Sequence, residues 1–96
     1  MPSPALELHV VSAPGDATAF LPDAISAPPG TLVRVTFSNA SNQAHNLTFG
    51  TPIAAGTKTI VDAGQSDAAT FTTPAPGTYE FVCTIHMGMS GTLVVS

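Results

Sequence analysis

Apolar and polar residues alternate along several short stretches of this 96-residue chain, which is the pattern of β-strands that bury one face. Val33, Val35 and Phe37, for example, share one face, and the residues between them are polar. A convincing helical period of 3.6 residues occurs nowhere in the sequence. The pattern therefore predicts short strands, and the expected strands are residues 5–11, 31–37, 46–49, 58–61, 68–73, 79–83 and 91–95.

Turn-forming residues separate these stretches. Residues 28–30 (Pro-Pro-Gly) and 50–52 (Gly-Thr-Pro) interrupt the alternation, and Pro76 and Gly77 suit the central positions of a tight turn. The nine prolines and eight glycines are spread through the chain, without an internal repeat or an interdomain linker. With about seven or eight strands at regular spacing, the sequence predicts an all-β fold: a single Greek-key β-sandwich, with residues 1–96 as one domain.

Composition excludes several classes of protein. Apolar residues make up 44% of the chain and charged residues only 8%, which is unlike a disordered protein. The formal net charge of −4, with Arg34 and Lys58 as the only basic residues besides histidine, argues against binding to nucleic acid or to an anionic membrane surface. No apolar run approaches the roughly 20 residues that span a bilayer.

The first residues lack the features of a signal peptide, since they include neither a charged region nor an apolar one. We expect the sequence to represent a mature form, or a domain excised from a larger protein, with an added methionine.

The most informative stretch follows the strand predicted at 79–83. Cys83, His86 and Met89 are spaced three residues apart, so one short loop can bring all three side chains to a single point. A second imidazole is available from His45, just before another predicted strand. Two imidazoles, a thiolate and a weak axial thioether form the ligand set of blue-copper electron-transfer sites. The sequence therefore predicts a copper site made by His45, Cys83, His86 and Met89.

Other residues compete for these roles or have simpler explanations. Met87 is an alternative axial ligand, although spacing favours Met89. An isolated cysteine is most often a buried, inert thiol, and only its neighbours make Cys83 a ligand candidate. His9 falls on the polar face of its strand and is expected to be solvated, and Tyr79 is expected to be structural, with its hydroxyl bonded near the turn. The scattered carboxylates are expected to be solubilising.

These motifs resemble the cupredoxins, specifically the plastocyanin and azurin family. The resemblance covers nearly the whole chain and includes residues 20–22, 29–33, the His45-Asn46 pair and the approach to the cysteine at 76–83. The spacing Cys-Thr-x-His-x-x-Met-x-Gly is most similar to the short ligand loop of amicyanins.

The resemblance implies a one-electron carrier with one type 1 copper that cycles between Cu(I) and Cu(II), and not an enzyme. It implies the ligands His45, Cys83, His86 and Met89, and it implies that Asn46 ties its strand to the cysteine loop at Thr84. In this family electrons pass through the exposed edge of the last histidine, so redox partner proteins would dock near His86. The resemblance further implies an extracytoplasmic location, periplasmic or on the outer side of a membrane, and we expect a monomer.

Other functions fit the sequence less well. A structural zinc site is disfavoured because thioether sulfur is a poor zinc ligand. Hydrolysis by a Cys–His nucleophile pair is disfavoured because no hydrolase motif supports it. Catalysis at a second copper ion is disfavoured because His9 is the one histidine left once His45 and His86 bind the first. A copper carrier or store would favour an exposed, flexible site. An electron-accepting domain cut from a larger membrane or multidomain protein remains an alternative.

Overall fold

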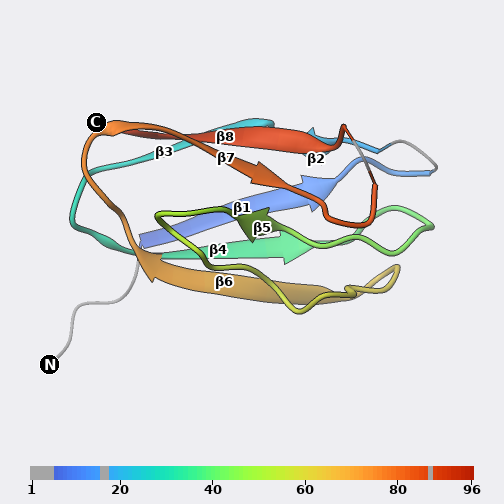
Figure 1. Cartoon of the computed structure of the whole chain (residues 1–96). Helices are drawn as coiled ribbons and strands as arrows, with labels where there is room; N and C mark the ends of the chain where they lie inside the picture. Colours follow the sequence, from blue (N-terminus) through green and yellow to red (C-terminus); the bar gives the residue numbers. More distant parts are fainter. Residues whose placement is uncertain (1–5, 16–17, 87) are drawn as a thin grey trace, which may run out of the picture.

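Eight β-strands form two four-stranded sheets in the computed structural model, which describes residues 6–15, 18–86 and 88–96 (Figure 1). One sheet has the strand order β2-β1-β4-β6, and the other has the order β3-β8-β7-β5. Within the described part of the chain, no helix is long and apolar enough to cross a membrane. The strands are β1 (Leu6–Ser12), β2 (Phe20–Leu21), β3 (Ala24–Ala27), β4 (Leu32–Ser38), β5 (Thr48–Phe49), β6 (Ser66–Thr72), β7 (Gly77–Val82) and β8 (Ser90–Val95).

The strand pairing is mixed in both sheets. β1 runs parallel to β4 and antiparallel to β2, while β4 pairs antiparallel with β6. In the second sheet β3 runs parallel to β8, and β8 pairs antiparallel with β7. The alternation in β4 buries Val33, Val35 and Phe37 completely, as the sequence predicts. The predicted all-β sandwich is thus confirmed.

Aromatic rings fill the centre of the core between the sheets. The ring of Phe81 lies 5.1 Å from that of Phe20 and 5.3 Å from that of Phe49, measured between centroids. Phe20 also meets Phe37 edge to face at 5.7 Å. Such pairs contribute about 0.5–1.5 kcal/mol each beyond the burial of their area. Directly across from Phe81 lies Gly91, where a Cβ atom would overlap the Phe81 ring, so this position needs a glycine.

The strand predicted at residues 58–61 is wrong. Only Val61 forms a β-bridge, with His45, and the rest of the segment is irregular. Side chains bind the backbone here instead of a neighbouring strand: the N–H of Lys58 donates to the carboxylate of Asp67 at 2.7 Å, and the carbonyl of Thr59 accepts from a distant side-chain amide at 2.8 Å. These bonds replace the ladder that a strand would need.

Tyr79 has the structural role expected of it. Its hydroxyl donates a hydrogen bond of 2.6 Å to the carbonyl oxygen of Ala75, across the bend that precedes β7. The ring packs against the core, so Tyr79 fixes both the turn and the start of the strand that leads to Cys83.

Candidate metal centre

His45 lies in the connection between β4 and β5, at the end of the sandwich that also holds the β7–β8 loop (Figure 1). Its backbone forms a two-way bridge with Val61, in which the N–H of His45 donates at 3.1 Å and its carbonyl accepts at 2.8 Å. The residue is completely buried. An imidazole in such a place has a fixed position and little contact with water.

Cys83 comes directly after β7, and the loop that follows it closes on itself. The N–H of Cys83 donates to the carbonyl of Met89 at 3.0 Å, and the N–H of Met89 donates to the carbonyl of His86 at 3.4 Å. Cys83 and Met89 are both buried and belong to the apolar core, whereas His86 is half-buried. The loop therefore turns the side chains of Cys83 and Met89 inward and leaves that of His86 closer to the surface.

The structure brings three of the four predicted ligands into contact. The Sγ of Cys83 lies 3.8 Å from the Nδ1 of His45, and the rings of His45 and His86 are 4.6 Å apart at their centroids. Met89 lies next to this group, because its carbonyl accepts the N–H of Cys83, and its side chain is buried. Its competitor Met87 lies outside the described residues.

The contact between Cys83 and His45 fits a metal ion. A separation of 3.8 Å lets both atoms bind one ion, because metal–nitrogen and metal–sulfur bonds are each about 2 Å long. Burial lowers the pKa of His45, and electrostatic repulsion between two protonated rings, those of His45 and His86, lowers it further. The imidazole therefore stays neutral, which is the form that binds metals. Thiolate, thioether and imidazole together suit copper better than zinc.

The imidazole of His86 also has one particular ring nitrogen available to bind a metal ion. The Nε2 of His86 lies 3.1 Å from the carbonyl oxygen of Ala44. A carbonyl can only accept, so Nε2 carries the proton and donates it, and the lone pair is on Nδ1. A hydrogen bond from one ring nitrogen that orients the other is common for metal-binding histidines. In His45, by contrast, Nε2 is buried without a hydrogen-bond partner among the described residues. The polar contact of this ring is the one between its Nδ1 and the thiol of Cys83.

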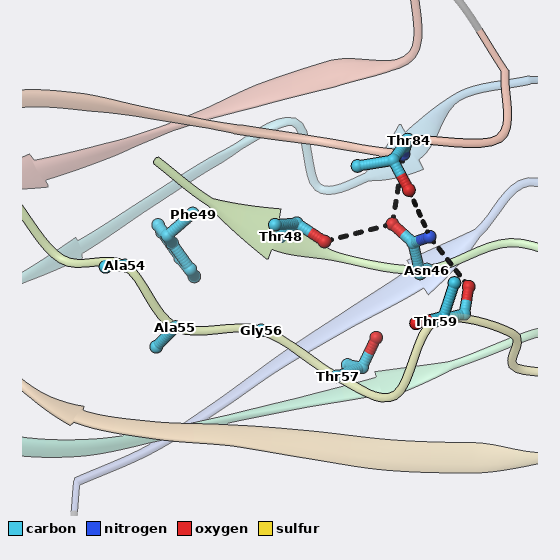
Figure 2. A pocket seen from close by; sticks show the side chains of 9 residues that line it. All are labelled: Asn46, Thr48, Phe49, Ala54, Ala55, Gly56, Thr57, Thr59 and Thr84. Carbon is cyan, nitrogen blue, oxygen red and sulfur yellow. Dashed lines mark hydrogen bonds between the residues drawn. The ribbon is translucent and has the colours of Figure 1, made fainter. Parts of the chain in front are cut away.

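Asn46 connects the two segments that carry the ligand candidates His45 and Cys83, through the contact with Thr84 that the resemblance implies (Figure 2). Its Nδ2 donates to the hydroxyl of Thr84 at 2.7 Å, and its Oδ1 accepts from the N–H of Thr84 at 3.0 Å. Nδ2 also donates to the carbonyl of Thr59 at 2.8 Å, and Oδ1 accepts from the hydroxyl of Thr48 at 3.1 Å. The residue after His45 is thereby fixed to the residue after Cys83.

A surface pocket of about 350 Å³ opens beside Asn46 (Figure 2). The polar groups of its wall are largely bonded to one another: Asn46 uses its amide fully, and the hydroxyl of Thr57 accepts from Leu47 and donates to Lys58. The pocket therefore supports the connection between the ligand segments and offers few free groups to a ligand. It is lined by Asn46, Thr48, Phe49, Ala54, Ala55, Gly56, Thr57, Thr59 and Thr84.

One set of residues beside the centre has no strong signal in the sequence. Ser12, Asn39 and Ser41 form a buried polar cluster next to the segment that carries His45. Small polar residues at the ends of strands usually indicate turns, and their burial becomes evident only once the two strands lie together.

The sequence matches the family model described as cupredoxin-like domain over residues 5–95, so this chain belongs to the cupredoxin-like family. Auracyanin-B of Chloroflexus aurantiacus is 34% identical, over 98% of this chain and 54% of that sequence. The chain thus spans about half the length of this relative. A structure of auracyanin B superposes with a TM-score of 0.85 and 31% identity, covering 100% of this chain and 92% of that one.

Two further structures are similar. Auracyanin from Roseiflexus castenholzii has a TM-score of 0.81 and 28% identity, covering 98% of this chain and 99% of that one. A reduced Cu(I) form of an amicyanin variant has a TM-score of 0.70 and 26% identity, covering 100% of this chain and 86% of that one. The family and the fold implied by the sequence motifs are therefore confirmed.

Proposed function

We propose that this protein is a small blue-copper electron carrier that binds one copper ion through His45, Cys83, His86 and Met89. The observation that carries the proposal is the 3.8 Å contact between the buried Nδ1 of His45 and the Sγ of Cys83, with the His86 ring beside them. The similarity to a copper(I) form of amicyanin supports the choice of metal. Copper supplies a centre that gains and loses one electron by cycling between Cu(I) and Cu(II).

The residues around the site favour fast electron transfer because they are held in place. His45 is fixed by its bridge to Val61, and Cys83 is fixed by its backbone bond to Met89. The hydrogen bonds between Asn46 and Thr84 join the two segments. Ligands fixed in this way move little when an electron arrives, and that lowers the energy of rearrangement.

His86 is the expected route for electrons, because it is the half-buried ligand candidate among buried ones. Next to it, Ile85 exposes 41% of its surface. An apolar rim around one imidazole edge suits a small, weak interface with a redox partner protein, which permits rapid exchange of partners. The same burial of His45 and Cys83 disfavours a copper carrier, which would release its metal by ligand exchange at an exposed site.

The wider context belongs to the same proposal. Residues 1–96 act as one domain, as a monomer, and outside the cytoplasm, where an electron carrier of this kind would meet its redox partners. The chain itself is not an enzyme: it holds and transfers an electron, and substrate chemistry belongs to its partners.

The test is an optical and spin-resonance titration of the metal-free protein with Cu(II). We expect an intense visible thiolate-to-copper band and a narrow copper hyperfine splitting that saturate at one equivalent, and reversible bleaching on reduction. Cys83→Ala is the control, and it should lose the band. A pale tetragonal spectrum in the native protein, or a band retained in Cys83→Ala, would overturn the proposal.

A further inference from the structure

The side chain of Asn39 lies inside the molecule, directly after β4 and close to the segment that carries His45. Only 2% of its surface is exposed. Both N–H groups of its amide are used: Nδ2 donates to the carbonyl of Gln43 at 2.7 Å and to the carbonyl of Val61 at 2.8 Å. The amide therefore joins two backbone segments that are far apart in the sequence.

Both acceptors belong to the backbone that holds His45. Gln43 precedes His45 by two residues, on the same connection. The carbonyl of Val61 that accepts from Asn39 also accepts the N–H of His45 at 3.1 Å, and the N–H of Val61 donates back to His45 at 2.8 Å. Asn39 thus restrains the backbone of His45 from two sides, without touching the imidazole itself.

The oxygen of the same amide fixes Asn39 in turn. Oδ1 accepts from the hydroxyl of Ser12 at 2.8 Å, from the hydroxyl of Ser41 at 2.7 Å and from the N–H of Ser41 at 3.1 Å. Ser12 is the last residue of β1 and is completely buried. A buried network with all its members bonded is rigid, and the position of β1 is thereby passed on to the connection that carries His45.

We propose that Asn39 is a positioning residue for His45, and that its Nδ2 bonds set the distance between the Nδ1 of His45 and the Sγ of Cys83 before any metal binds. The inference deepens the proposed function and rests on it for the effect on copper. The central claim concerns the metal-free chain: the side-chain amide of Asn39, bonded to Gln43 and Val61, holds the backbone of His45.

The variant that isolates this amide is Asn39→Asp, which keeps the size and the acceptor oxygen but removes both donors. The matched control is Ser12→Ala, which removes a buried group at the oxygen end of the network and leaves both Nδ2 bonds in place. Amide hydrogen exchange of the metal-free proteins reports the bond between His45 and Val61. The copper spectrum and the reduction potential of the loaded proteins report the site.

We expect Asn39→Asp to speed exchange of the His45 N–H by about tenfold or more and to shift both the copper hyperfine splitting and the potential. Ser12→Ala should lower the unfolding midpoint but move these readouts much less than Asn39→Asp does, because the two bonds from Ser41 still hold Oδ1. Equal spectral shifts in the two variants, or none in Asn39→Asp, would overturn the inference. If Asn39→Asp does not fold, the native protein decides: rapid exchange of the Asn39 side-chain protons would overturn it, and slow exchange would support it. A native protein without a blue spectrum would refute the proposed function alone, since the exchange measurement needs no copper.

Discussion

Asn46 and Thr84 hold each other by two hydrogen bonds, one from the asparagine amide to the threonine hydroxyl and one from the threonine N–H to the asparagine oxygen. They follow His45 and Cys83 in the chain, so a contact that neither ligand candidate makes helps to restrain the distance between the two. The candidate metal centre is therefore held in place by hydrogen bonds that form without a metal ion.

Replacing Asn46 tests this contact. Asn46→Ala leaves the Thr84 N–H and the Thr59 carbonyl without their partner, and we expect the metal-free protein to lose about 2–3 kcal/mol of unfolding free energy. The loss is measured by chemical denaturation. Thr84→Val is the control, because it removes only the hydroxyl bond and should lose about 1 kcal/mol. Equal losses in the two variants would contradict the importance of the backbone bond.

Gly91→Ala tests the packing of the core below the centre. The added methyl group would overlap the ring of Phe81, which is completely buried and enclosed by other rings. We expect a loss of about 2–3 kcal/mol, seen as a lower denaturation midpoint. Gly50→Ala serves as the comparison, since nothing lies within 4 Å of a Cβ there, and it should stay within about 0.5 kcal/mol of the native protein. A tolerated Gly91→Ala would mean that the ring can move aside.

Met89→Leu separates the role of the sulfur from that of packing. Met89 is 1% exposed, and leucine has a similar volume, so the unfolding free energy should fall by less than about 1.5 kcal/mol. The copper-loaded variant should remain blue, with a raised reduction potential, because the weak axial donor is lost. Voltammetry measures the shift. If Met87→Leu raised the potential and Met89→Leu did not, the axial assignment would be wrong.

His86→Gly tests the electron route. Removal of the half-buried imidazole should greatly slow electron exchange with a redox partner. The unfolding free energy of the metal-free protein should change little. Stopped-flow mixing with a small redox protein measures the rate. His9→Gly is the comparison, because His9 is exposed on β1, and its exchange rate should match that of the native protein. An unchanged rate in His86→Gly would point to another route.

Asp67 gives stability a defined dependence on pH. The backbone N–H of Lys58 donates to its carboxylate and lowers the pKa of Asp67 below its usual 3.8. A lowered pKa means that the ionised form is favoured by folding, so this contribution is complete above pH 3.8 and is lost as the pH falls through the pKa of the folded state. Urea denaturation of the metal-free proteins should show Asp67→Asn less stable at pH 7, by less than about 1 kcal/mol because the site is open to solvent.

The difference between the native protein and Asp67→Asn should shrink when the same denaturation is repeated near pH 3. A difference that stays constant between the two pH values would show that the charge of Asp67 is not involved.

Local patterns were sufficient to predict much of this structure. The alternation at Val33, Val35 and Phe37 identifies the buried face of β4, because side chains point to opposite sides of a strand in turn. The spacing of Cys83, His86 and Met89 predicts a ligand loop, because those residues lie within one short turn of chain. The resemblance to a known family supplied the contact between Asn46 and Thr84.

The rest depended on contacts between distant segments. Residues 58–61 read as a strand, but side chains from elsewhere bind their backbone, and the sequence of the segment itself does not reveal this. The cluster around Asn39 joins Ser12, Ser41 and Val61, and its burial follows from the packing of β1 against β4. In the sequence alone, a single serine or asparagine is as typical of a turn as of a buried polar cluster.

The position of β8 has a consequence for the order in which the protein is made. β8 lies inside its sheet, between β3 and β7, and Met89 directly precedes it. Synthesis begins at the N-terminus, so His45 and the residues of β7 are joined to the chain before those of β8. The sheet that ends in Cys83 stays incomplete until residue 95 has been synthesised. A metal ion held by the proposed ligands would therefore enter only after β8 has been made and has paired with β3 and β7.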